Sequence, residues 1–319
     1  MSTRVTRILS LLSVPIAGFL LVGCGGGSGG DASAGAKTSR LDLSITDAPM
    51  DAADEVWVQF RAVEFKPEDG EPVTVEFRDD AGNPAPRRIN LLPLQDGRST
   101  LLLDDVTLPA GNYQWLRMIV DNEPNVRDSY LMVEGRECEL RIPSGDESGL
   151  KLQGGFALPA DGSAALTVDF DLRKSLRAPP GQKGNAPDCT QAYLMKPVLR
   201  LVRDSQAGGI TGTVDPSLVP DETCSRMVYV FTDGENAAGS TAPDDQDGTP
   251  ADPVQMVKAD AVTGIYRASF LPAGAYTVAF TCGEDDLDAD DSLDFTAVRG
   301  ATVQAGLVTT GMDLPAPAG

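Results

Sequence analysis

The sequence predicts an all-β protein that consists of two β-sandwich domains. Apolar and polar residues alternate with the period of a half-buried strand in several short runs, which include 41–45, 56–60, 73–77, 113–120 and 166–170. Clusters of Gly, Pro, Asn and Asp separate these runs, and the chain holds 33 Gly and 23 Pro. Many short strands with turn residues between them are typical of sandwiches and barrels. Near 51–55 and 216–222, short helical turns are an alternative.

The first 23 residues have the layout of an export signal. Two arginines precede an apolar stretch over 8–22, which is too short to span a bilayer comfortably. This stretch leads into Leu-Val-Gly-Cys, which ends at Cys24 and resembles the lipobox of bacterial lipoproteins. The resemblance implies a diacylglycerol on the sulfur of Cys24 and, because Gly25 rather than Asp follows, anchoring at the outer membrane. An ordinary secretory signal with an incidental cysteine is the alternative.

A flexible linker and two folded domains follow the signal over 1–23. Residues 24–39 are rich in Gly and small polar residues, so about 15 of them form a coil with a typical span of roughly 20 Å. The predicted first sandwich covers 40–206 and the second covers 207–319. The boundary is placed where a strand-like run gives way to Asp-Ser-Gln-Ala-Gly-Gly at 204–209. Both parts are long enough to hold a core of their own.

Acidic residues dominate the mature chain. Without the two leader arginines it carries 24 basic and 47 acidic residues, which gives a net charge of −23. Such a charge argues against nucleic acid as a partner and against binding to anionic lipid by electrostatics alone. It favours cations, although a solvated acidic surface that keeps an exported protein soluble is the simpler explanation.

Four of the five cysteines remain once Cys24 is lipidated. An even number in a chain exported to an oxidising compartment predicts disulfides. Each half of the chain holds two, so we predict that Cys138 pairs with Cys189 and Cys224 with Cys282. Each bond would stabilise its domain by roughly 4 kcal/mol in the chain-entropy model. Metal binding is the competing interpretation, but the spacings are long, CxxC is absent and the chain has no histidine.

Five ordered segments make the first domain resemble a known family. They are Ser44–Pro49, Ile89–Leu94, Pro143–Leu152, Val168–Ser175 and Tyr193–Arg200. Together they span about 40–204 and resemble the bacterial lipoprotein family called domain of unknown function 4382. That family brings no known activity and no catalytic residues.

A short phrase, Leu-Pro-Ala-Gly followed two residues later by Tyr, occurs at both 108–113 and 271–276. Pro and then Gly make a tight turn, and Tyr starts the next strand. This phrase and Gly209–Val214 make the second domain resemble, more weakly, the Ig-like and transthyretin-like sandwiches of carboxypeptidase-regulatory domains. The resemblance implies related architecture in the two domains.

No catalytic residue is predicted. A Ser-His-Asp or Cys-His site is excluded because the chain has no histidine to act as the base. Ser148 and Lys151 match the Ser-x-x-Lys spacing of penicillin-binding enzymes, but they lie in a glycine-rich stretch that lacks the partner motifs. Asp169 and Asp171 share one face of a strand and are close enough for a carboxylate pair. Because the apolar residues of that strand take the other face as core, we expect both aspartates to point outward and to form a solvated ion-pair group with the basic residues at 173–174.

The candidate metal site lies in an acidic loop of the second domain. Alternating carboxylates in that loop can face one hard cation, and oxygen ligands suit calcium. The predicted ligands are Asp286, Asp288, Asp290, Asp291 and Asp294. The loop departs from an EF-hand, because Asp291 takes the glycine position and Ala297 takes the position of the bidentate glutamate. A solvated acidic loop is the alternative, and 244–248 is a weaker candidate of the same kind.

Three classes of function remain. We favour a noncatalytic cell-envelope lipoprotein, a binding or adhesion module that presents sandwich loops to an envelope protein or a polysaccharide and that calcium could stabilise. A structural or accessory lipoprotein of an outer-membrane assembly is the alternative, and a hydrolase comes third. The basic stretch at 173–203 either binds an anion or pairs with acidic groups of the chain itself. Trp57 and Trp115 fall in predicted strands, so no sugar-stacking platform is obvious from the sequence.

Overall fold

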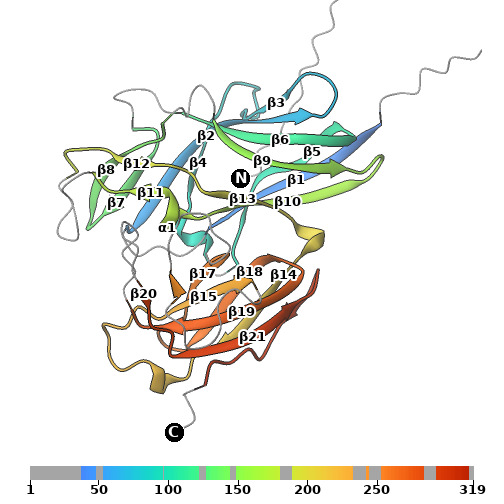
Figure 1. The fold of residues 1–319 in the computed structure, drawn as a ribbon. Helices are drawn as coiled ribbons and strands as arrows, with labels where there is room; N and C mark the ends of the chain where they lie inside the picture. Colours follow the sequence, from blue (N-terminus) through green and yellow to red (C-terminus); the bar gives the residue numbers. More distant parts are fainter. Residues whose placement is uncertain are drawn as a thin grey trace, which may run out of the picture.

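The computed structural model describes residues 37–47, 53–95, 97–121, 127–143, 149–179, 189–232, 242–243, 253–283 and 292–315. Within them the fold is all-β, as predicted, and its strands form two sandwiches, one above the other (Figure 1). No helix among these residues is long and apolar enough to cross a membrane. The predicted lipidation site at Cys24 and the linker up to residue 36 lie outside the described residues.

The first sandwich packs a four-stranded sheet against a nine-stranded sheet. The four-stranded sheet has the order β13-β10-β1-β5, in which β1 is parallel to β10 and antiparallel to β5. Its strands are β1 (Thr38–Asp47), β5 (Thr100–Pro109), β10 (Ser163–Phe170) and β13 (Leu199–Arg203). The nine-stranded sheet contains β2 (Glu55–Pro67), β3 (Val73–Glu76), β4 (Arg87–Asn90), β6 (Gly111–Val120), β7 (Tyr130–Val133), β8 (Arg136–Arg141), β9 (Leu150–Leu158), β11 (Leu176–Arg177) and β12 (Tyr193–Met195).

The long strand β2 organises the nine-stranded sheet. Its residues pair with β3 and β4 along one edge and with β6 and β7 along the other. Val56, Val58 and Phe60 are fully buried in the core between the two sheets, whereas Trp57 and Gln59 point to the opposite face and are half-buried. This alternation is expected of a strand that has its core on one side only.

The second sandwich has a three-stranded and a four-stranded sheet. The first contains β14 (Ala207–Thr213), β18 (Ile265–Pro272) and β22 (Val308–Thr309); the second contains β15 (Met227–Thr232), β17 (Gln255–Lys258), β19 (Gly274–Thr281) and β21 (Ala297–Val303). One apolar core lies between them, and a smaller cluster around Tyr229, Phe231 and Leu293 lies on the other face of β15. A short pair, β16 (Ala242–Pro243) and β20 (Ser292–Leu293), completes the described strands.

The repeated Leu-Pro-Ala-Gly phrase makes the same connection in both sandwiches. It joins β5 to β6 in the first and β18 to β19 in the second, and in each case the chain crosses from one sheet to the other. The Tyr113 hydroxyl donates to the Pro109 carbonyl at 2.7 Å, and the Tyr276 hydroxyl donates to the Pro272 carbonyl at 2.8 Å. The two domains therefore share this corner, in agreement with the related architecture predicted from the sequence.

Short helical turns occur at four places in the described chain. They are η1 (Leu92–Leu94), α1 (Leu172–Ser175), η2 (Asp204–Gln206) and η3 (Pro216–Leu218). The turn at η3 confirms one of the two predicted alternatives, but α1 was not predicted. Asp171 follows β10 and caps α1, because its side chain accepts a hydrogen bond from the backbone N of Lys174 at 3.0 Å.

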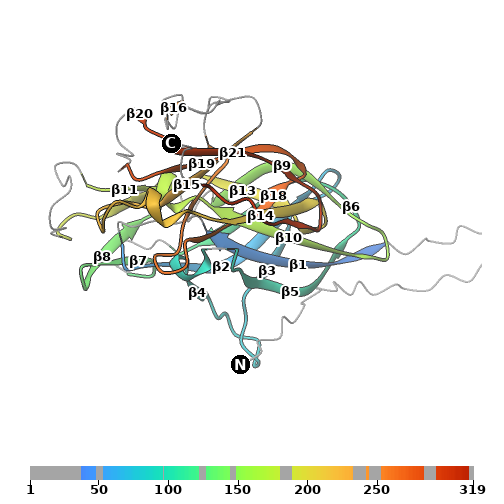
Figure 2. The same ribbon diagram turned by 90° about the horizontal axis from the view of Figure 1, so that it is seen from below.

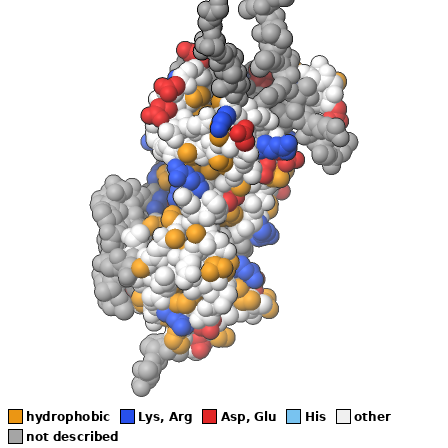
Figure 3. Space-filling model, turned by 90° about the vertical axis from the view of Figure 1, so that its right-hand side faces the viewer, with side chains coloured by type: hydrophobic (Ala, Val, Ile, Leu, Met, Phe, Trp, Pro, Cys, Tyr) orange, Lys and Arg blue, Asp and Glu red, His pale blue; other side chains and the backbone are white. Residues whose placement is uncertain are grey.

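The junction between the sandwiches is formed by α1 and β13 on one side and by strands of the second domain on the other. In both Figure 1 and Figure 2, β13 lies beside the second sandwich, and it contacts β18. Lys174 Nζ donates to the Pro253 carbonyl at 3.2 Å, and Arg173 Nη1 lies 3.4 Å from the Tyr229 hydroxyl. On the face shown in Figure 3, acidic and basic side chains are interspersed along both bodies and form no broad patch of one sign.

Candidate functional site

An aromatic and polar cluster stands on the outward face of the nine-stranded sheet. Trp57 of β2 pairs with Asn90 of β4 on one side and with Tyr130 of β7 on the other. Its side chain and that of Tyr130 are half-buried and lie on the face opposite to the core. We name this group the Trp57 cluster; its members are Glu55, Trp57, Gln59, Arg88, Asp121, Asp128 and Tyr130.

The rings of this cluster are held in fixed orientations. The centroids of the Trp57 and Tyr130 rings are 6.2 Å apart, and the ring planes differ by 25°. Trp57 Nε1 donates to Glu55 Oε2 at 2.6 Å, so the indole is tied along its own strand. The Arg88 guanidinium lies 5.7 Å from the centre of the Tyr130 ring, within the range of a cation–π contact.

Gln59 is the centre of the polar half of the cluster. Its Nε2 donates to Asp121 Oδ2 at 2.9 Å and to Asp128 Oδ1 at 3.2 Å. Its Oε1 accepts from Arg88 Nη2 at 3.1 Å. Arg61 Nη1 adds a longer ion pair of 3.7 Å with Asp121 Oδ1. The amide thus fixes two carboxylates and one guanidinium side by side on the sheet surface.

Two backbone anchors keep this part of the sheet in place. Asn90 Oδ1 accepts from the backbone N of Val56 at 3.1 Å and from that of Leu92 at 3.3 Å. The buried Ser129 hydroxyl accepts from the backbone N of Gln59 at 3.1 Å. The cluster therefore rests on rigid strands, which is the arrangement that positions a binding site most accurately.

Trp115 stands near the other end of the same sheet face, in different surroundings. It pairs with Lys66 of β2, nine residues beyond Trp57, which is about 30 Å along a strand. Lys151 Nζ lies 4.4 Å and the Arg117 guanidinium 5.6 Å from the Trp115 ring centre. Cations of the chain itself therefore already contact this ring.

The Trp57 cluster was not predicted from the sequence, although one signal for it was present. Within the run 56–60, Val56, Val58 and Phe60 are in the core phase, so Trp57 is out of phase with them. A large aromatic residue at a solvent-facing strand position is a marker of a binding surface. The polar partners of Gln59 come from loops and other strands, and no local pattern brings them together.

The cysteine pairing was predicted correctly. Cys138 is bonded to Cys189 and Cys224 to Cys282, with Cα–Cα distances of 4.7 and 4.4 Å. Each disulfide therefore lies within one sandwich.

The prediction that Asp169 is solvated was wrong. Its side chain is only 9% exposed and forms an ion pair with Arg200 of β13. Burial raises the pKa of Asp169, and Arg200 acts against that rise. Asp169 Oδ1 is buried without a hydrogen-bond partner among the described residues.

Asp171 is also less exposed than expected. Its side chain is 21% exposed, and burial raises its pKa, which Lys174 counteracts at 3.9 Å. Asp47 lies next to this pair, since its Oδ1 accepts from the backbone N of Leu172. Lys151 is on the other sheet over Trp115, and Ser148 lies outside the described residues. The structure thus gathers three aspartates at the ends of β1 and β10 but does not bring Lys151 to them.

Most of the predicted calcium site lies outside the described residues. Only Asp294 is described, and it is exposed; Asp286, Asp288, Asp290 and Asp291 are not described, and neither is 244–248. The described part of the chain contains no group of three or more acidic or cysteine side chains that could hold a metal ion. The calcium site therefore stays a prediction.

The basic stretch at 173–203 pairs with the chain itself in several places. Arg200 binds Asp169, Lys174 reaches the second domain, and Arg203 Nη2 donates to the Gly155 carbonyl at 2.8 Å. These contacts support the second of the two predicted roles, in which the stretch joins parts of the protein.

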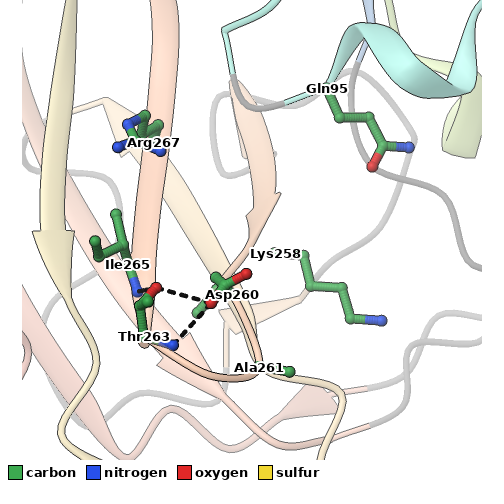
Figure 4. A pocket seen from close by; sticks show the side chains of 8 residues that line it. Gln95, Lys258, Asp260, Ala261, Thr263, Ile265 and Arg267 are labelled. Carbon is green, nitrogen blue, oxygen red and sulfur yellow. Dashed lines mark hydrogen bonds between the residues drawn. The ribbon is translucent and has the colours of Figure 1, made fainter.

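Two cavities border the junction of the domains. One of about 540 Å³ lies between Gln95 of the first domain and Lys258, Asp260 and Arg267 of the second (Figure 4). The Asp260 carboxylate accepts from the backbone N and the hydroxyl of Thr263 at 2.7 and 2.8 Å, and these bonds lower its pKa. The other, of about 400 Å³, lies between β9, β13 and Pro272. Neither contains a member of the Trp57 cluster or a predicted catalytic or metal-binding residue.

A comparison with family profiles assigns the first sandwich to a known family. A family profile described as a domain of unknown function, DUF4382, matches residues 38–197, just over half of the chain. The chain belongs to this family. The DUF4382 domain thus includes the whole Trp57 cluster and the disulfide between Cys138 and Cys189. A search of curated proteins found no match.

Several solved structures align with much of the chain at low similarity. The TIE protein of Bacillus anthracis is 12% identical with a TM-score of 0.19; the match covers 87% of this chain but only 34% of the TIE protein. GBS52, the minor pilin of Streptococcus agalactiae, is 9% identical over 87% of this chain and 98% of its own, with a TM-score of 0.20. A putative cell adhesion protein from Parabacteroides distasonis is 10% identical over 89% and 96%, with a TM-score of 0.21. At such TM-scores these names carry no argument about this protein.

Proposed function

We propose that this protein is a noncatalytic binding protein of the bacterial cell envelope, an adhesion-type lipoprotein held by a lipid on Cys24. The two disulfides support a location outside the reducing cytoplasm. The lipobox-like sequence that ends at Cys24 supports a membrane anchor. The acidic mature chain disfavours nucleic acid and anionic lipid surfaces as partners.

The Trp57 cluster is the observation that carries the proposal. Trp and Tyr contribute more to binding interfaces than most side chains, because each offers a large rigid surface with a polar tip. Here both stand on a solvent-facing sheet, stacked at 6.2 Å and tied to Glu55 and Arg88. Side chains that are ordered before binding lose less entropy when a partner docks. The cluster therefore has the properties of a preformed binding surface.

The test uses cell envelopes and two tryptophan variants. The full chain carrying Cys24→Ala, which is released from the membrane, is mixed with isolated envelopes, and the bound fraction is measured by sedimentation. We expect Trp57→Ala to weaken binding at least tenfold. Trp115→Ala removes the same kind of side chain from the same sheet face and should leave binding unchanged.

Melting curves of both variants show whether each remains folded. Absence of envelope binding by the parent chain, or equal binding by the folded Trp57→Ala variant, would refute the proposal. A stoichiometric complex that copurifies with the chain and survives Trp57→Ala would instead support the alternative function, an accessory lipoprotein of an outer-membrane assembly.

A further inference from the structure

We infer that the ligand of the Trp57 cluster is a neutral polysaccharide. This inference rests on the proposed function and adds the chemical class of the ligand. It depends on three properties of the cluster, namely its aromatic surface, its hydrogen-bonding groups and its balance of charge.

The aromatic surface matches one face of a sugar ring. Pyranose rings present a patch of C–H groups that packs against the electron-rich face of an indole or a phenol. Trp57 and Tyr130 provide two such rings on neighbouring strands, with centroids 6.2 Å apart. The polar Nε1 of Trp57 is already bonded to Glu55, so a ligand would meet the part of the half-buried indole that Tyr130 leaves uncovered.

The polar groups match the hydroxyls that surround a sugar ring. A hydroxyl both donates and accepts hydrogen bonds. A carboxylate can accept from it and a guanidinium can donate to it, so the two groups placed together suit a sugar hydroxyl. Asp121 and Asp128 each bind Gln59 Nε2 through one oxygen, and Arg88 binds Gln59 Oε1. An ionised carboxylate can accept about four hydrogen bonds, more than these contacts use. The cluster can therefore accept from hydroxyls at the aspartates and donate to them from Arg88.

The charges of the cluster favour a ligand without net charge. Arg88 binds Gln59 and the neighbouring Arg61 pairs with Asp121, so both basic groups contact members of the cluster itself. The acids of the cluster are Glu55, Asp121 and Asp128. Three acids against two bases leave this surface slightly acidic, on a mature chain that is strongly acidic throughout. This surface would repel a polyanion such as a uronic-acid polymer.

Trp115 serves as an internal comparison. Lys151 and Arg117 lie 4.4 and 5.6 Å from its ring centre, and Arg117 is also bonded to Glu64 at 2.6 Å. A sugar would have to displace these cations from the Trp115 ring. Among the described residues no cation lies over the Trp57 ring, and the one such contact inside the Trp57 cluster is Arg88 over Tyr130. The inference thus assigns different outcomes to the two tryptophans of this chain.

Affinity electrophoresis of the full Cys24→Ala chain tests the ligand class. The gels contain one soluble polysaccharide each: a β-glucan, a galactomannan or an arabinoxylan as neutral probes, and alginate as the acidic comparison. We expect at least one neutral probe to retard the parent chain and Trp115→Ala equally, and Trp57→Ala to lose at least nine-tenths of the retardation. Alginate should have no effect.

A second variant protects the test against misfolding. Arg88 is exposed on β4, so Arg88→Ala should leave the fold intact and weaken neutral-glycan binding three- to tenfold. No retardation by any neutral probe, equal loss in the two tryptophan variants, or Trp57-dependent binding of alginate would overturn the inference. If envelopes bind in a Trp57-dependent way while all neutral probes fail, the proposed function stands and the ligand class is wrong. If envelopes do not bind at all, the proposed function fails first.

Discussion

Asp169 and Asp171 are two carboxylates whose surroundings depart strongly from those of a surface aspartate. They lie at the end of β10, where Arg200 of β13 and the basic side chains of α1 cover them. Burial raises the pKa of both groups above the ordinary value of 3.8. The ion pairs with Arg200 and Lys174 offset only part of the cost of removing these charges from water.

This shift sets the direction of a pH effect on stability. Because the folded protein holds these protons more tightly than the unfolded chain, the two groups favour folding most below the unfolded carboxyl pKa. That contribution falls as the pH rises through the raised folded pKa values. Asp171→Asn keeps an oxygen that can cap Lys174 and removes the charge. We expect this variant to gain stability relative to the parent chain between acidic and neutral pH.

Urea unfolding at several pH values between 3 and 7 measures this difference. Asp260→Asn is a suitable contrast, because hydrogen bonds from Thr263 lower the pKa of Asp260 and its stabilising effect is lost on acidification. A stability difference between Asp171→Asn and the parent chain that does not change with pH would contradict the assignment.

The strand pattern correctly placed Asp169 away from the core of the first sandwich, but Asp171 lies one residue beyond the strand, as the cap of α1. It could not show that they would be covered, because the covering groups come from β13, α1 and the second domain. For the same reason the pattern located Trp57 on a strand but not the cluster around it. Alternation identifies which face a residue takes, and only the tertiary fold decides what lies on that face.

At the scale of elements, the corner made by Leu-Pro-Ala-Gly occurs in both sandwiches. The tyrosine hydroxyl binds the carbonyl four residues before it, and the ring is buried against the core. Burial raises the pKa of Tyr113 to about 12, so it remains a hydrogen-bond donor at all relevant pH values. The sequence alone could identify this turn, because the repeat is local.

We expect Tyr113→Phe and Tyr276→Phe each to destabilise its domain by about 1 kcal/mol, the typical contribution of one hydrogen bond. Denaturant unfolding followed by circular dichroism measures the change. Tyr130→Phe is the control, since this ring stands on the outer sheet face rather than at a corner. Equal stability of the Tyr113→Phe variant and the parent chain would show that the hydroxyl bond does not support the turn.

Strand β14 packs closely against the segment 308–314, because β14 has glycines where the two backbones approach each other. A Cβ added at Gly212 would lie 2.1 Å from the Met312 carbonyl oxygen, whereas one added at Gly300 of β21 would meet nothing within 4 Å. We expect Gly212→Ala to destabilise the second sandwich by about 1–3 kcal/mol through this overlap. Gly300→Ala should be neutral or slightly stabilising. Thermal unfolding of both variants is the measurement, and equal melting temperatures would contradict the close packing.

At the scale of the whole molecule, each sandwich has its own core and its own disulfide, and polar contacts of α1 join the two. The fold class, the main strands and the cysteine pairing could be predicted, because they depend on alternation, turn residues and cysteine position. The nine-stranded sheet and the junction could not, because strands distant in sequence, such as β12 and β8, pair within it. The acidic loop at 286–294 remains a sequence-based prediction.

Each domain has its own disulfide, so removing one disulfide should destabilise one domain only. Tryptophan fluorescence can show which domain is affected. Both Trp57 and Trp115 lie in the first sandwich, so tryptophan fluorescence follows that domain only. Replacing Cys224 and Cys282 by Ala opens a loop of 58 residues and should lower the stability of the second domain by about 4 kcal/mol. The fluorescence transition should stay in place while the circular dichroism transition splits. A matching shift of both signals would mean that the domains unfold as one unit.

Photo-crosslinking in intact cells tests most directly whether the Trp57 face binds an envelope component. A photoreactive side chain is placed at Arg88, beside Tyr130, and in a separate chain at Lys151, over Trp115. Both positions are exposed and lie on the same sheet face. Position 88 belongs to the Trp57 cluster, where loss of the Arg88 side chain should weaken binding without abolishing it, and position 151 adjoins Trp115 instead. We predict an adduct of larger mass from position 88 and none from position 151. No adduct from position 88, or equal adducts from both positions, would contradict a binding site at the Trp57 cluster.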